Sequence, residues 1–136
     1  MSTVSKAENP EENPRVEAVF EDIMHTRGTS FVGNIWRYLA FDPSLLESVW
    51  KDVKRLMTGN TLLDPKTKEM IYVAVSIANS CSYCIHSHTA AARAQGMSDA
   101  EHAELLDIIS LAARTNHLLN GLQVPVDDVF DKSVSN

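Results

Sequence analysis

The chain contains few of the residues that interrupt helices. Its 136 residues include only five glycines and five prolines, whereas the helix formers Ala, Leu, Glu and Met recur throughout, which favours an α-helical protein. The sequence has no glycine-rich phosphate loop, no internal repeat and no low-complexity block. These absences remove the usual sequence signatures of nucleotide-binding loops and repeat architectures. The composition, 44% apolar and 22% charged, is that of an ordinary globular protein.

Long hydrophobic runs and excess basic charge are also missing. No apolar run reaches the roughly 18 residues of a membrane-spanning helix, and residues 1–14 lack the apolar core of a secretory signal. The 12 basic residues are outnumbered by 18 acidic ones, giving a net charge of -6. Because phosphate binding requires a basic surface, nucleic acid is not expected as a main partner. We expect a cytoplasmic protein that binds neither nucleic acid nor membranes.

Cysteine is scarce as well, and the two cysteines lie close together. Cys81 and Cys84 share the eight-residue segment 81–88 with His86 and His88, in the pattern C-x2-C-x3-H. Thiols and imidazoles are the side chains most able to attack, move protons or bind metal near neutral pH. In a reducing compartment, a close cysteine pair is more often redox-active or metal-binding than a permanent bridge.

Helical periodicity and capping signals predict an all-α fold of five or six helices. We expect a flexible N-terminal arm at residues 1–13 and a single helical domain over residues 14–136. Segment 70–78 is almost continuously apolar, so a buried strand is an alternative there, but the Asp64-Pro65 start and the length favour a helix. The predicted helices cover residues 14–26, residues 31–39, residue 43 to a stop at 58–60, residue 65 to a cap at 79–80, residue 81 to Gly96, and residues 99–122.

The last predicted helix is apolar around much more than one face. A stripe of that width is either deeply buried or located at a subunit contact. Asn116, His117 and Asn120 interrupt the stripe, and buried polar groups need partners. We therefore treat Asn116 and His117 as candidate pocket residues, with a subunit contact as the alternative.

The spacing of the cysteines and His88 places all three on one face of a helix that starts near Ser80. Both cysteines would lie in the first turn, where unpaired N–H groups favour a thiolate. His88, one turn further on, could accept the proton of Cys84. Two cysteines three residues apart at a helix start can also form a disulfide. The pattern predicts a dithiol that cycles through thiolate, sulfenic acid and disulfide.

A catalytic imidazole needs an orienting group, and Glu69 is the best candidate. In one straight helix from residue 65 to residue 88, Glu69 and Cys84 would be about 22 Å apart. The two can meet only if the chain turns back near Asn79-Ser80. We therefore predict that the helix of Glu69 packs beside the helix of the cysteines. The alternative is that Glu69 is a plain first-turn carboxylate stabilised by the helix dipole.

Two other interpretations of the cysteine pair remain open. Cys81, Cys84 and His88, with or without His86, could bind zinc, although all lie on one helix and no second cysteine pair completes a tetrahedral site. The cysteines could also be inert core residues. Tyr83 is expected to pack or hydrogen-bond beside the site.

The pattern of Glu69, eleven residues, Cys81, two residues, Cys84, three residues and His88 resembles the AhpD-like, or carboxymuconolactone decarboxylase-like, superfamily. The resemblance covers roughly residues 60–125. It implies an all-α fold, homo-oligomers such as trimers or hexamers, and alkylhydroperoxidase-type reduction of organic hydroperoxides without a cofactor or metal. A lipoyl-bearing or thioredoxin-like dithiol protein is implied as the reductant.

The resemblance also implies a role for each site residue. Cys84 would attack the peroxide, Cys81 would resolve the sulfenic acid as a disulfide, and Glu69 and His88 would form a proton relay. Tyr83 departs from the best-known peroxidases of this family, which have His before the second cysteine. The family also contains decarboxylases without the cysteine pair, so the alternative function is a non-redox enzyme or a small-molecule binding module.

Two arguments disagree about which of the two sulfurs is activated. The helix dipole favours Cys81, which lies nearest the helix start. The neighbouring His88 and the resemblance favour Cys84. We follow the second argument, because a positioned base gives the thiol a route for its proton.

Overall fold

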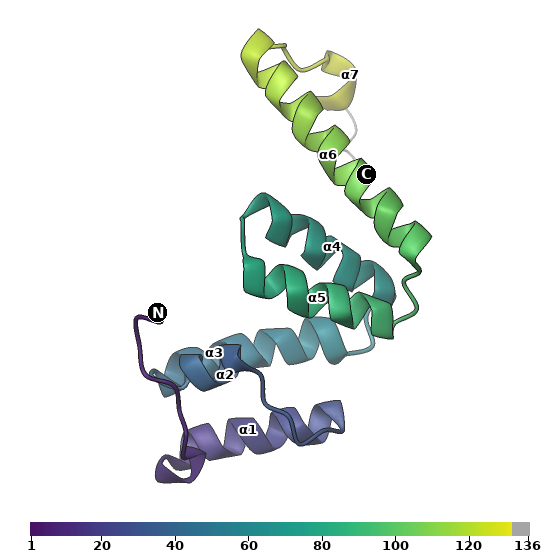
Figure 1. The fold of residues 1–136 in the computed structure, drawn as a ribbon. Helices are drawn as coiled ribbons and strands as arrows, with labels where there is room; N and C mark the ends of the chain where they lie inside the picture. Colours follow the sequence, from purple (N-terminus) through teal and green to yellow (C-terminus); the bar gives the residue numbers. More distant parts are fainter. Residues whose placement is uncertain (132–136) are drawn as a thin grey trace. The chain divides into compact units, whose positions relative to one another are not determined.

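The computed structural model describes residues 1–131, and over this range the chain is helical and contains no β-strand (Figure 1). The all-α prediction is confirmed. The described residues form seven α-helices instead of five or six, because the short α7 follows the last predicted helix. Their bounds are α1 (Pro14–Arg27), α2 (Asn34–Leu39), α3 (Pro43–Val53), α4 (Pro65–Ala78), α5 (Ser82–Ala94), α6 (Asp99–Leu122) and α7 (Asp128–Asp131), with a 3₁₀ turn η1 (Pro10–Glu12) and a π turn η2 (Lys54–Thr58).

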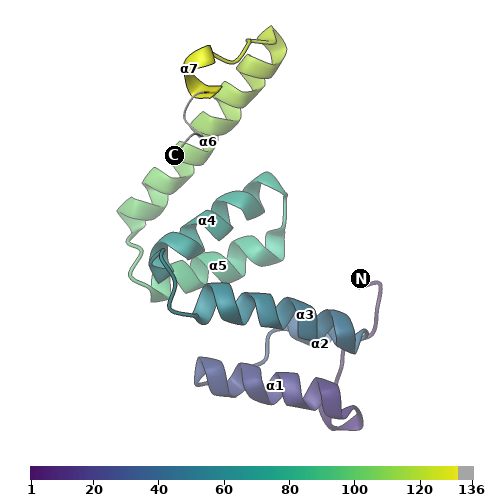
Figure 2. The ribbon, with the colours of Figure 1, turned by 180° about the vertical axis from the view of Figure 1, so that it is seen from behind.

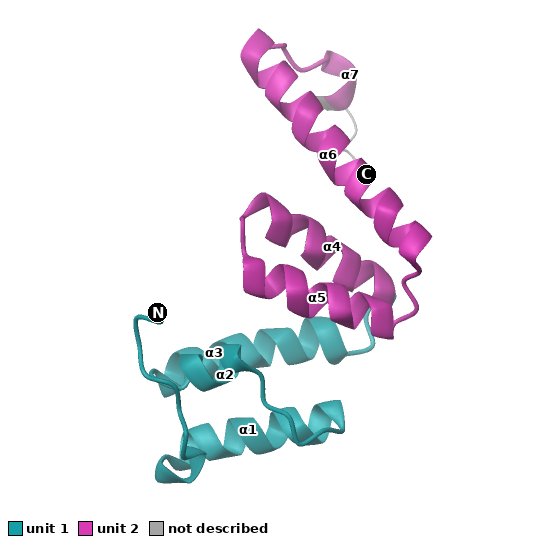
Figure 3. Cartoon of the chain, in the orientation of Figure 1, with its two compact units in different colours: residues 1–65 teal, residues 66–136 magenta. Residues whose placement is uncertain are grey.

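The chain divides into two compact units, Met1–Pro65 and the part from Lys66 onward (Figure 3). The first contains α1 to α3 and the second contains α4 to α7. Each unit has its own cluster of buried apolar side chains, so each is described separately below. The single domain over residues 14–136 stays a prediction.

The first unit has the larger core. α1 and α3 lie side by side in both views of the ribbon (Figures 1 and 2), and the rings of Trp36 and Trp50 meet edge to face with centroids 5.3 Å apart. The indole N–H of Trp50 donates to the Asp22 carboxylate at 2.7 Å, so its one polar group is satisfied. The buried residues of this core are Val16, Val19, Phe20, Ile23, Val32, Trp36, Leu46 and Trp50.

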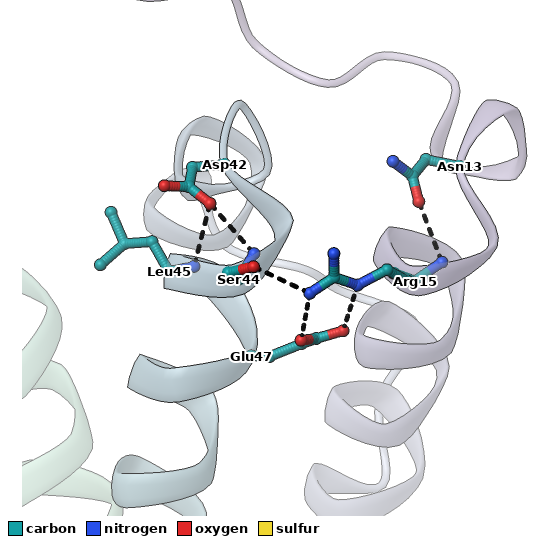
Figure 4. Close-up of polar contacts among 6 residues, drawn as sticks. All are labelled: Asn13, Arg15, Asp42, Ser44, Leu45 and Glu47. Carbon is teal, nitrogen blue, oxygen red and sulfur yellow. Dashed lines mark hydrogen bonds and ion pairs between the residues drawn. The ribbon is translucent and has the colours of Figure 1, made fainter.

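Capping and ion pairing fix the ends of α1 and α3, as Figure 4 shows. The Asn13 side chain accepts from the backbone N–H of Arg15, and the Asp42 side chain accepts from Ser44 and Leu45. These are the N-caps that Asn13-Pro14 and Asp42-Pro43 predict. The Arg15 guanidinium donates to both oxygens of Glu47, at 2.9 and 2.6 Å. Because α1 carries the arginine and α3 the glutamate, this bidentate pair joins the two helices.

Two further segments of the first unit bear on the sequence predictions. Within the arm predicted at residues 1–13, the Ala7 backbone N–H donates to the Arg37 carbonyl at 3.0 Å, and the Arg37 guanidinium donates back to the Ala7 carbonyl. The flexibility of this arm stays a prediction. At the other end of the unit, η2 ends at Thr58, the predicted position, and a Cβ on the next residue, Gly59, would collide with the Arg55 carbonyl oxygen, so this end requires glycine.

The second unit is built on α4 and α5, which lie side by side in both views (Figures 1 and 2). Segment 70–78 is helical, so the strand alternative is wrong. Ser98 and Glu101 form the predicted capping box at the start of α6. The core of this unit is small and consists of Val73, Ala92, Met97 and Leu105.

α6 does not bury its wide apolar surface within this unit. Leu105 is its one fully buried side chain, and every residue from Ser110 to Leu122 is exposed. Deep burial within this unit is therefore wrong as an explanation of the stripe, and the subunit contact remains. Across residues 1–131, no helix combines the length and hydropathy that crossing a bilayer requires.

Candidate functional site

The chain reverses direction between α4 and α5 through a tight turn at Ser80. The Ser80 N–H donates to the Ile77 carbonyl at 3.1 Å, and the Cys81 N–H donates to the Ser76 carbonyl at 2.9 Å. Ser80 has the left-handed φ of 56°. These two bonds form a Schellman motif, which normally has glycine at the left-handed position. The reversal occurs where the sequence predicts it, just before the first sulfur.

The start of α5 differs from the prediction by one residue, and the difference changes the role of Cys81. We predicted a helix that begins at Cys81 with a cap at Asn79-Ser80. Instead Cys81 is itself the N-cap, and its Sγ accepts the Cys84 N–H at 3.3 Å. Ser80 cannot cap α5 because its backbone is committed to the turn that ends α4. The Cys81 sulfur therefore faces the positive end of the helix directly.

Glu69 and His88 meet across the two helices. Glu69 Oε2 lies 2.6 Å from His88 Nδ1, and the side chains are only 15% and 23% exposed. A carboxylate can only accept a hydrogen bond, so the imidazole donates from Nδ1; in the neutral ring this leaves the lone pair on Nε2. The prediction that the Glu69 helix packs beside the cysteine helix is confirmed. His86, two residues earlier, is exposed and does not take part.

A residue that sequence reasoning missed completes the surroundings of the imidazole. The Tyr72 ring stacks on the His88 ring, with centroids 3.8 Å apart and planes inclined by 18°. Tyr72 lies in the apolar run 70–78, where it looked like an ordinary core residue. The available signal was its position three residues after Glu69, which places both side chains on one face of α4.

The pKa values of the two thiols are shifted in opposite directions. Both cysteines are free thiols and half-buried. The Cys84 thiol donates to the Cys81 sulfur, and this bond, with the Cys84 backbone N–H, lowers the pKa of Cys81. Burial, followed by that same donated bond, raises the pKa of Cys84 to about 11. Among the hydrogen bonds of residues 1–131, none joins His88 to either sulfur.

The expectation that the helix start and His88 would lower the pKa of Cys84 is therefore wrong for the resting dithiol. The Cys84 backbone N–H donates to Cys81, and the half-buried Cys84 keeps its proton. Which sulfur attacks a substrate is a separate matter, because attack depends on a base that removes the proton as well as on the resting charge.

The remaining candidates are exposed side chains. Tyr83, between the cysteines, is 45% exposed. Asn116 and His117 lie in the exposed half of α6, and in the described part of the chain neither bonds to the site residues. Their place in a pocket stays a prediction.

The best-formed cavities do not include the site residues in their walls. The two best-formed cavities, of about 320 and 390 Å³, are lined by residues of the first unit, with Val16 and Trp50 respectively among their walls. Within residues 1–131, no three His, Cys, Asp or Glu side chains are grouped so as to hold a metal ion. The chemistry at hand is thus two thiols beside a paired imidazole and carboxylate.

Comparison with known proteins finds a matching family model and a matching solved structure. The model of the carboxymuconolactone decarboxylase family matches residues 45–127. The crystal structure of an alkylhydroperoxidase AhpD core from Rhodospirillum rubrum is 59% identical, covers 96% of this chain and 97% of its own, and superposes with a TM-score of 0.92. No curated protein matches the chain.

Proposed function

Because the chain belongs to the carboxymuconolactone decarboxylase family and has the AhpD-like fold, we propose that it is a thiol-dependent peroxidase that reduces organic hydroperoxides. The observation that carries this proposal is the Glu69–His88 pair, held at 2.6 Å beside two free thiols. Cys84 and His88 are four residues apart on α5, so their Cβ atoms are about 5–6 Å apart. The base and the thiol can therefore approach within proton-transfer distance by a small side-chain motion.

The proposed cycle starts with proton transfer from the Cys84 thiol to His88 Nε2. The Cys84 thiolate attacks the terminal peroxide oxygen, the O–O bond breaks, and Cys84 becomes a sulfenic acid. The leaving alkoxide takes the proton from His88 and departs as an alcohol. The Cys81 thiol then gives up its proton and its sulfur attacks the Cys84 sulfur. The S–O bond of the sulfenic acid breaks, the leaving hydroxide takes up that proton and departs as water, and the disulfide forms. One hydroperoxide is thus reduced by two thiols.

The raised pKa of Cys84 supports a need for the relay. A thiol with a pKa of about 11 is almost fully protonated at neutral pH, so a positioned base must remove its proton before attack. Cys81 already carries the larger thiolate share, which suits a sulfur that closes the disulfide. Because the two thiols share a hydrogen bond, they titrate as a pair.

The proposal includes a reductant and a compartment. A dithiol protein, lipoyl-bearing or thioredoxin-like, would open the Cys81–Cys84 disulfide by exchange. The cytoplasm is the expected setting, since thiols are kept reduced there.

A second copy of the chain is the proposed occupant of the bare α6 surface. Leu111, Leu118 and Leu122 are exposed along this helix, and α7 exposes Val129 and Phe130 beside it. Further copies of the chain, related by a rotation axis, would cover this surface with apolar side chains of their own. Sedimentation at micromolar concentration tests this point: trimers or hexamers are expected, and a monomer would contradict it.

A second candidate function is non-redox acid–base catalysis on the same scaffold. The observation that favours it is that the Glu69–His88 pair forms without either sulfur. The family whose model matches is also named for a decarboxylase. On this alternative His88 exchanges protons with a bound substrate, and the thiols are dispensable.

Steady-state reduction of cumene hydroperoxide, with dihydrolipoamide as the reductant, separates the two functions. We expect Cys84→Ser to abolish turnover and Glu69→Gln to slow it about a hundredfold, the usual range for a proton relay. Glu101→Gln is the matched control: it removes a carboxylate paired with Lys66 in the same unit and should leave the rate unchanged. Full activity of Cys84→Ser would overturn the peroxidase proposal and favour the acid–base alternative.

A further inference from the structure

The stacked contact between Tyr72 and His88 has no part in the proposed reaction cycle. The ring centroids are 3.8 Å apart and the planes are nearly parallel, at 18°. Glu69 holds the edge of the imidazole through Nδ1, and Tyr72 covers one of its faces. Both residues come from α4, so a single helix holds the imidazole at two points.

We infer that Tyr72 is a positioning residue for the relay: its ring fixes His88 in the orientation in which Nδ1 donates to Glu69 and Nε2 remains free for a proton. The catalytic consequence rests on the proposed function. The placement of the ring does not, and it can be measured without any peroxide.

The physical reason lies in how loosely one hydrogen bond holds a ring. The second side-chain torsion of histidine has a broad, two-fold preference, so the imidazole could rotate away from Glu69 or exchange its tautomer. A parallel ring contact opposes this rotation, because turning the imidazole out of the stack loses the whole aromatic contact. The tyrosine ring also keeps water from one face of the imidazole, because the two rings are stacked. The rest of the His88 side chain is partly open, at 23% exposed.

The position of Tyr72 makes it suitable for substitution. The residue is 38% exposed and does not belong to the buried cluster of its unit. Its hydroxyl makes no hydrogen bond within residues 1–131. The ring alone should therefore be sufficient, and phenylalanine should replace tyrosine without loss.

The experiment compares Tyr72→Leu with Tyr72→Phe in the reduced full-length chain, using nitrogen NMR of the neutral His88 ring. Wild type and Tyr72→Phe should show one tautomer, with the proton on Nδ1, whereas Tyr72→Leu should show a mixture. The matched control is Ile71→Ala, which truncates an exposed apolar side chain on the same helix and should keep the single tautomer. A single tautomer in Tyr72→Leu would overturn the inference.

Kinetics separate failure of this inference from failure of the proposed function. The rate of hydroperoxide reduction should fall about tenfold in Tyr72→Leu, the value of one aromatic contact, and stay within about twofold of wild type in Tyr72→Phe. If wild type reduces no hydroperoxide, the function is wrong and the NMR result still decides the positioning role. If wild type is active and Tyr72→Leu is equally active, the positioning role is wrong and the function stands.

Discussion

The two units of the chain use their residues for different purposes. The first unit buries eight apolar residues, two of them tryptophans, and ties its helices together with the Arg15–Glu47 pair. The second unit buries four, while its cysteines, His88 and Glu69 are half-buried and α6 is largely bare. Closely packed side chains are fixed, whereas reacting groups need access to a substrate. The difference indicates that stability is concentrated in the first unit and chemistry in the second.

The largest expected effect is a loss of stability from a substitution in the first unit that leaves the thiol chemistry of the second unit unchanged. Trp50→Ala should lower the free energy of unfolding by about 3–5 kcal/mol, because it empties a core site and removes one of the two side chains that donate to Asp22. Denaturant unfolding measures this. Trp50→Phe, which keeps an aromatic ring, should cost less. The folded variant should retain the thiol reactivity of wild type. A loss below about 1 kcal/mol, the size typical of surface changes, would contradict the assignment.

An intermediate effect concerns the two sulfurs. The pKa of Cys81 lies below its ordinary value and that of Cys84 is about 11. Near neutral pH Cys81 should therefore hold much more thiolate than Cys84. Labelling with iodoacetamide, followed by peptide mass analysis, should modify Cys81 first and reach Cys84 as the pH approaches 11. Equal labelling at pH 7 would show that the sulfurs do not differ in this way.

The smallest expected effect is a gain of stability at the turn between α4 and α5. Ser80 holds a left-handed φ of 56°, which costs a non-glycine residue about 1 kcal/mol. Ser80→Gly should therefore raise the free energy of unfolding by up to about 1 kcal/mol. Gln123 has the same left-handed conformation at the end of α6, so Gln123→Gly is a control that should behave alike. A destabilised Ser80→Gly would mean that the serine side chain matters more than the backbone.

Helix ends illustrate what the sequence could predict. Four helices end with the same backbone motif, at Gly28, Ser80, Gly96 and Gln123. Glycine adopts positive φ without a steric cost, so glycine ends can be predicted, as the end at Gly96 was. The other two were not recognised as left-handed, because serine and glutamine have no such preference. At Ser80 this led to the wrong N-cap for α5, although the reversal itself was predicted correctly.

The functional site also has features that could be predicted from the sequence and features that could not. Glu69 and His88 could be paired from sequence, because residue type, spacing and one turn determine whether they meet. The pKa of Cys84 could not, since it depends on burial by residues from other elements. Tyr72 was missed because an aromatic residue in an apolar run looks like core until its neighbours in space are known.

The measurement that tests the central claim most directly is the intact mass of the reduced protein after brief treatment with a hydroperoxide. Wild type should lose two hydrogen atoms, as Cys81 and Cys84 join. Cys81→Ser should instead gain one oxygen, as Cys84 stops at the sulfenic acid, and Cys84→Ser should stay unchanged. A wild-type mass that does not change under excess hydroperoxide would contradict the account, because the convergence of the two thiols with Glu69–His88 would then serve some other chemistry.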